Sequence, residues 1–259
     1  MKTNYPPATI LGCHTRMLRS TIVNDEYELS IYLPPSYESS EQRYPTLYVL
    51  DSPMVFSSAV TGAYYQNWNS VVGVPEMIVV GIGKQMKSLD EWWPIRERDY
   101  LPIAPPNNPD MGGQADAFLN FFDQELIPFI DTNYRTQQDD RIIWGASMGG
   151  IFVLYAMFNK THLFHRYIST CPSFVLGGKI VFDYEQILAS ESLPLEARLF
   201  VSVGTADHEF APNVEAFMSA LSARALPNLK FKTFLVDGLG HAPALLPSLV
   251  YGIEAVYAL

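Results

Sequence analysis

The second half of this sequence alternates short apolar segments with segments that carry apolar residues at helical spacing, which strongly limits the folds available to it. Buried strands are predicted at 141–145, 165–171, 197–204 and 229–237. Helices are predicted after them, at 148–158, 181–189, 211–225 and 245–259. Repeated strand–helix alternation predicts a mainly parallel sheet with helices on both faces.

The first half of the chain is predicted to be rich in strands. Residues 16–23 and 27–35 alternate apolar and polar side chains on either side of Asn24-Asp25, a pair typical of turns. This pattern predicts an antiparallel hairpin that extends the sheet. Residues 46–51 and 76–83 are predicted to be short buried strands, and residues 116–130 a helix.

The segment 84–115 fits neither a strand nor a helix period. It contains five prolines, the pair Trp92-Trp93 and the pair Gly112-Gly113. We interpret it as a long loop insertion over the sheet edge, within a single domain that spans 1–259. Long loops in compact domains are usually functional.

Composition and charge exclude several classes of protein. Hydrophobic residues make up 48% of the 259 residues and charged residues 17%, a balance typical of a packed globular protein. The formal net charge of −10 argues against nucleic acid, anionic membranes and strongly anionic substrates as partners. Because no apolar run of about 18 residues is present, no membrane span is expected.

Cysteine usage and the first residues favour a cytoplasmic protein. Cys13 and Cys171 are far apart in the sequence, so they form neither a disulfide framework nor a metal-ligand cluster. Residues 1–16 lack the apolar core of a secretory signal. We interpret Cys171 as a buried, inert thiol.

The motif Gly145-Ala146-Ser147-Met148-Gly149 lies between a predicted strand and a predicted helix. A serine on a sharp strand-to-helix turn has a strained backbone and an outward hydroxyl, and the flanking glycines let neighbouring backbone pass close. The helix that follows directs free amides at a developing oxyanion. Ser147 is therefore the candidate nucleophile, although a plain glycine-rich turn is the alternative.

A serine nucleophile needs a base, and the base needs an acid. Among the five histidines only His241 lies in a loop after the last strand, the place of the base in α/β hydrolases. The acid is expected between the two, after a strand, where Asp207 and Glu209 are both available.

With these residues the sequence resembles the "Putative esterase" family of α/β hydrolases, which includes esterase D-like enzymes, feruloyl esterases and siderophore esterases. The resemblance rests on Tyr44-Pro45 with "LYVLD", and on "RERDYLP", "FFDQELIPFIDTNYR", "GASMGGIFVLYAMF", "CPSF" and "GTADHEF". It implies the α/β-hydrolase fold, a mainly parallel twisted sheet with an antiparallel N-terminal hairpin. It also implies Ser147 as nucleophile, His241 as base and Asp207 as acid, with no metal or organic cofactor.

Other residues of the site follow from the same resemblance. The oxyanion hole would use the amide of Met148 and a second donor two residues after Asp51. That position is Pro53, which has no N–H, so Ser52 or Met54 in this loop is the candidate donor. Trp92 and Trp93 either line a substrate pocket or anchor their own loop. In the same loop, Arg96, Arg98 and Asp99 are expected to form a cluster of ion pairs.

These residues predict a serine esterase, a carboxylic ester hydrolase that acts on a small-molecule ester through an acyl-enzyme and a Ser-His-Asp triad. Two alternatives remain open: an acyltransferase with the same site, and a non-catalytic binding protein of the same fold. The sequence does not select among aryl, sugar, siderophore and lipid esters.

Overall fold

The computed structural model describes residues 9–86, 88–106, 109–110, 112–176, 196–224, 226 and 228–259. Within these residues eight strands form one sheet in the order β1-β2-β4-β3-β5-β6-β7-β8. The strands are β1 (Cys13–Ser20), β2 (Asp25–Tyr32), β3 (Tyr44–Val49), β4 (Ile78–Gly83), β5 (Thr136–Ala146), β6 (Arg166–Thr170), β7 (Ala197–Gly204) and β8 (Leu229–Val236).

The sheet is antiparallel at its N-terminal edge and parallel elsewhere. β2 pairs antiparallel with both β1 and β4, and all pairs from β4 to β8 are parallel. Asn24 takes the left-handed conformation, with φ of 55°, in the turn between β1 and β2. The mainly parallel sheet and the N-terminal hairpin predicted from the sequence are thus confirmed.

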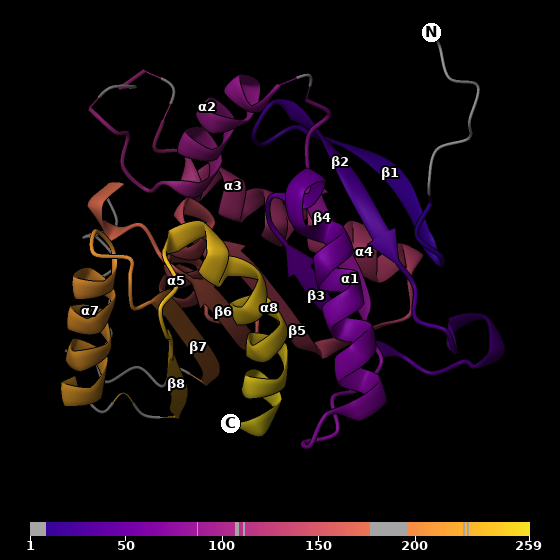
Figure 1. Ribbon diagram of the computed structural model, residues 1–259. Helices are drawn as coiled ribbons and strands as arrows, with labels where there is room; N and C mark the ends of the chain where they lie inside the picture. The colour runs from indigo at the N-terminus through magenta and orange to yellow at the C-terminus, as the bar shows by residue number, and fades with distance from the viewer. Residues whose placement is uncertain are drawn as a thin grey trace, which may run out of the picture.

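Helices cover both faces of this sheet (Figure 1). Helices α1 (Ser52–Asn69) and α8 (His241–Ala258) contact each other and pack on one face. The side chains between these two helices and the sheet form one hydrophobic core, and a larger core lies on the other face. Five helices contribute to the larger core: α2 (Leu89–Tyr100), α3 (Ala115–Phe121), α4 (Ile127–Asn133), α5 (Met148–Asn159) and α7 (Ala211–Arg224). Short helical turns lie at η1 (Tyr37–Ser39), η2 (Phe122–Leu126) and η3 (Phe174–Leu176).

Helix α5 is the central helix of the larger core. Every residue from Met148 to Phe158 is buried, which explains why this helix is apolar on all sides rather than on one stripe. It packs against β5, the strand that leads into its N-terminal turn, and against β6, the next strand of the sheet. The start of α5 is therefore held rigidly.

The structure corrects several boundaries expected from the sequence. The segment 84–115 is not all loop, because Leu89–Tyr100 form helix α2 in spite of Pro94. The expected loop after β3 is helix α1, which begins at Ser52. The last helix begins at His241 rather than at 245. The predicted helix at 116–130 is divided into α3, the π-helical turn η2 and α4. The helix predicted at 181–189 lies outside the described residues.

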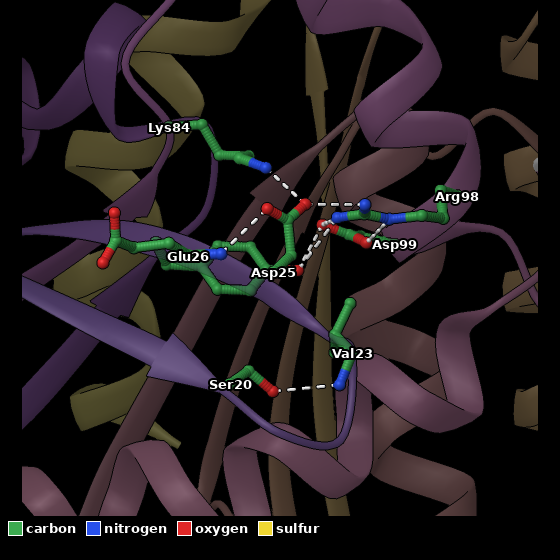
Figure 2. Close-up of polar contacts among 8 residues, drawn as sticks. Ser20, Val23, Asp25, Glu26, Lys84, Arg98 and Asp99 are labelled. Carbon is green, nitrogen blue, oxygen red and sulfur yellow. Dashed lines mark hydrogen bonds and ion pairs between the residues drawn. The ribbon is translucent and has the colours of Figure 1, made fainter.

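An ion pair and a hydrogen bond attach α2 to the N-terminal hairpin (Figure 2). Arg98 Nη1 lies 2.7 Å from Asp25 Oδ2, and Arg98 Nε lies 2.6 Å from Asp99 Oδ1. Lys84 also pairs with Asp25. Burial raises the pKa of Asp25, but hydrogen bonds from Lys84 and Arg98 outweigh it and leave the pKa below its usual value. The Tyr27 hydroxyl donates to Asp99 at 2.8 Å.

These contacts explain a helix that its own sequence does not favour. Pro94 removes a backbone donor from the helix interior, and half of the residues in Leu89–Tyr100 are charged. Contacts with other elements supply the missing stability.

None of the helices in the described ranges is both long enough and apolar enough to cross a bilayer.

Candidate active site

Four neighbouring strands end at the same edge of the sheet, where the predicted site residues follow them. β5, β6, β7 and β8 are parallel and adjacent, and they end at Ala146, Thr170, Gly204 and Val236. The loops that leave this edge carry the candidate nucleophile, acid and base. Ligands of parallel α/β sheets bind at this edge.

Ser147 occupies the strained turn that the motif predicted. Its φ of 59° and ψ of −119° are unusual for a residue with a side chain, and it connects β5 directly to α5. Its amide donates to the carbonyl of Thr170 at 2.9 Å. A Cβ on Gly145 would lie 2.3 Å from the carbonyl oxygen of Gly149, so the turn requires glycine at 145.

His241 and Asp207 form a direct contact at the same edge. Nδ1 of His241 lies 2.9 Å from Oδ2 of Asp207, whose side chain is buried. Because Nδ1 is engaged, Nε2 is the nitrogen left to exchange a proton. The Phe210 ring lies 4.5 Å from the imidazole, centroid to centroid, and limits its tilt.

The backbone brings this pair together through a glycine. A Cβ on Gly204 would lie 2.1 Å from the carbonyl oxygen of Leu239, so only glycine lets the loop before α8 cross the end of β7. The amide of Ala206 donates to the same carbonyl at 3.0 Å. Glu209, the other acid considered, is exposed.

Ser173 lies at the same edge, and the motifs of the sequence do not single it out. Its Oγ lies 2.7 Å from Oγ of Ser147, and the residue is fully buried. It follows β6, between the loops of the nucleophile and the acid. Its only sequence signal is its place in "CPSF", one of the stretches on which the family resemblance rests.

The structure distinguishes the candidate oxyanion donors. Met148 is the first residue of α5, where amides are free of intrahelical partners. The Ser52 hydroxyl is buried against Gly81 with no hydrogen-bond partner among the described residues. The amide of Met54 donates to the carbonyl of Asp51 at 3.0 Å. The backbone amide of Ser52, at the first turn of α1, has no partner within the helix.

The two tryptophans of α2 have different surroundings. Trp92 is partly buried and donates from Nε1 to Oδ1 of Asp51 at 3.1 Å. Its ring stacks under the guanidinium of Arg96, 4.4 Å from ring centroid to Cζ. Trp93 is 47% exposed and donates to Glu97. Trp92 therefore has the contacts of an anchor, and Trp93 is the more available to a ligand.

Within the described part of the chain, one group of three side chains has the composition of a metal site. Ligand atoms of Cys171, Asp207 and His241 lie within 4.8 Å of one another. Burial, reinforced by the charge of Asp207, raises the pKa of the Cys171 thiol to about 12. Nδ1 of His241 and Oδ2 of Asp207 also bond each other, which engages two of the three ligand atoms. The geometry fits a hydrogen-bonded pair of Asp207 and His241 with the neutral thiol of Cys171 beside it.

Residues 20–228 match the family described as "Putative esterase". The chain belongs to this esterase family. Ferri-bacillibactin esterase BesA of Bacillus subtilis is 31% identical over 175 residues, which cover 64% of this chain and 60% of that protein. YbbA, an uncharacterized protein of the same species, is 26% identical over 217 residues, or 81% of this chain and 80% of that protein.

Solved structures support the same family and fold. The BES protein from Bacillus cereus superposes with a TM-score of 0.87 at 25% identity, covering 99% of this chain and 98% of that chain. The siderophore hydrolase EstA of Aspergillus nidulans superposes with a TM-score of 0.81 at 20% identity over 99% of both chains, which bears on the fold alone. The predicted esterase-family α/β-hydrolase fold is confirmed.

Proposed function

We propose that the protein is a serine carboxylic ester hydrolase with Ser147, His241 and Asp207 as its catalytic triad. The contact of 2.9 Å between Nδ1 of His241 and Oδ2 of Asp207, at the sheet edge that carries the Ser147 turn, is the observation that supports it most. A buried carboxylate on Nδ1 fixes the tautomer with Nε2 as base and stabilises the imidazolium that forms.

The reaction has two halves. Ser147 attacks the ester carbonyl while Nε2 of His241 takes its proton, and the amides of Met148 and Ser52 stabilise the oxyanion. The proton then passes from His241 to the leaving alcohol, which leaves an acyl-enzyme. His241 next activates a water molecule that releases the acid. No step in this sequence requires a metal.

The names of the relatives support a siderophore ester as the natural substrate. BesA is a ferri-bacillibactin esterase, and a protein from Emericella nidulans that is 30% identical over 108 residues is a siderophore enterobactin esterase. We therefore favour a siderophore ester over a sugar or lipid ester. BesA is named for a ferric siderophore, and a protein of Escherichia coli that is 25% identical over 151 residues is named for an apo-siderophore, so the relatives include both iron states.

Fluorophosphonate labelling tests the reaction class. A fluorophosphonate probe should modify the wild-type protein at Ser147, located by peptide mass spectrometry. Ser147→Ala should fold with an unchanged circular dichroism spectrum, resist labelling and lose nearly all turnover of p-nitrophenyl acetate. An unlabelled wild-type protein without turnover would indicate a non-catalytic binding protein instead.

An ester panel tests the substrate class. We expect kcat/KM for enterobactin to exceed that for a feruloyl ester and for p-nitrophenyl esters of increasing chain length. Enterobactin is assayed with and without ferric iron, because the relatives are named for both a ferric and an iron-free siderophore. Faster turnover of long-chain p-nitrophenyl esters would reject the siderophore assignment and leave the hydrolase assignment in place.

A further inference from the structure

The hydroxyl of Ser173 contacts the reacting atom of the proposed nucleophile. The two Oγ atoms lie 2.7 Å apart, a normal distance for a hydrogen bond between hydroxyls. Ser173 is fully buried, whereas Ser147 is partly exposed. The hydroxyl of Ser173 is therefore held by protein on every other side.

The backbone, and not only a side-chain rotamer, places Ser173 there. Cys171 takes the left-handed conformation, with φ of 46°, and turns the chain sharply after β6. The amide of Ser173 then donates to the carbonyl of Ser147 at 3.2 Å. A Cβ on Gly150 would lie 3.2 Å from Cα of Pro172, so a glycine lets this turn pack on the start of α5.

The protons of the two hydroxyls determine what Ser173 can do. In the resting protein either hydroxyl can donate to the other. Once the proton of Ser147 is directed to His241, only Ser173 can donate in this pair. We infer that Ser173 is a further catalytic residue, which donates a hydrogen bond to Oγ of Ser147 as that oxygen loses its proton and attacks.

The step balances without a further reactant. The O–H bond of Ser147 breaks and its proton moves to Nε2 of His241. A bond forms between Oγ and the ester carbonyl carbon, and the carbonyl π electrons move to the carbonyl oxygen. Ser173 keeps its own proton throughout. The same donor assists the second half of the reaction, when Oγ of Ser147 becomes the leaving group.

The effect should fall on kcat rather than on KM. A hydrogen bond to oxygen strengthens as negative charge develops on that oxygen, and Oγ of Ser147 carries partial negative charge in the transition state but not in the enzyme–substrate complex. The inference rests on the proposed function, because it assigns a donor to the same nucleophile.

Ser173→Ala tests the inference on esters and on the fluorophosphonate probe. We expect kcat and the inactivation rate constant to fall together by about 10- to 100-fold, the scale of one hydrogen bond to a charged group. KM should stay within about twofold by the same reasoning. Ser202→Ala is the matched control, since it removes a buried hydroxyl that has no partner in the described structure. It should leave both rate constants near those of the wild type.

The outcomes separate this inference from the proposed function. If wild type is labelled at Ser147 and Ser173→Ala retains kcat within twofold, or loses activity through KM alone, Ser173 has only a structural role. If wild type is neither labelled nor active, the proposed function itself fails. Melting temperatures show whether each variant is folded. If Ser173→Ala does not fold, Ser173→Cys, with a weak S–H donor of similar shape, carries the same expected loss.

Discussion

The guanidinium of Arg96 binds the carboxylate of Asp51, with Nε 3.1 Å from Oδ1 and Nη2 3.1 Å from Oδ2. Nη2 also donates to the carbonyl of Ala146 at 3.0 Å. Asp51 directly precedes Ser52, and Ala146 directly precedes Ser147. One side chain of α2 therefore connects the two strand-to-helix turns that carry the proposed nucleophile and oxyanion donors.

Arg96→Ala should destabilise the protein strongly. The side chains of Arg96 and Asp51 are both only 4% exposed, so the substitution leaves the Asp51 carboxylate buried without its cationic partner. Breaking a buried pair in this way costs about 3–5 kcal/mol of unfolding free energy. Urea denaturation of Arg96→Ala and the wild type measures this loss.

Lys160→Ala is the control for Arg96→Ala. Lys160 and Asp123 form an ion pair with 23% and 25% of their side chains exposed, and such a pair contributes about 0–1 kcal/mol. Arg96→Lys keeps the charge but not the planar fork, so its stability should lie between wild type and Arg96→Ala. Equal losses for Arg96→Ala and Lys160→Ala would contradict the connecting role of Arg96.

The two tryptophans should respond differently to replacement by alanine. Trp92→Ala removes the ring stacked on Arg96 and the hydrogen bond to Asp51, so it should lower the melting temperature by several degrees. Trp93→Ala removes a ring that is 47% exposed, so it should change KM or acyl-chain preference with little loss of stability. The reverse pattern would assign the anchor to Trp93 and the ligand contact to Trp92.

Cys171 should resist alkylation in the folded protein. Burial raises the pKa of its thiol to about 12, so little of the reactive thiolate is present at pH 8. Iodoacetamide should therefore modify Cys171 only in urea, as measured by peptide mass spectrometry. Cys13, which is partly exposed, serves as the internal reference and should react faster. Rapid loss of activity with modification of Cys171 would indicate an accessible thiol.

The strands and the Ser147 turn could be predicted because local patterns encode them. Buried parallel strands are continuous apolar runs, and a serine between glycines at the end of such a run is typical of a strand-to-helix nucleophile turn. Helix α2 was missed because Pro94 and the many charged residues around it argue against a packed helix, while the ion pairs that stabilise it reach residues distant in sequence. The start of α8 at His241 was missed because Gly240 and Pro243 resemble a loop.

Side-chain contacts at the site were less predictable than the elements that carry them. Sequence order restricted the acid to Asp207 or Glu209, and the family resemblance indicated Asp207. The crossing of Gly204 by the 237–240 loop is the physical reason that Asp207 meets His241. The contact of Ser173 with Ser147 depends on a left-handed residue, Cys171, that no sequence pattern indicates.

Asp207→Asn and Glu209→Gln together test the acid of the proposed triad. An amide at 207 can donate to Nδ1 of His241 and hold the ring in the wrong tautomer. The same change in serine proteases lowers kcat by about 10⁴-fold, and we expect a loss on that scale here. Glu209 is exposed and lies just before α7, where its charge favours the helix N-terminus, so Glu209→Gln should cost about tenfold or less. Both variants are measured on p-nitrophenyl acetate at one pH, with melting temperatures to confirm folding.

Oδ1 of Asp207 also accepts a hydrogen bond from the amide of Phe210 at 3.4 Å, and the side-chain oxygen of an asparagine can retain this contact. A defect in Asp207→Asn should therefore reflect the changed contact with the imidazole rather than a changed loop. A crippled Glu209→Gln beside an active Asp207→Asn would move the acid to Glu209 and leave Asp207 as a capping residue.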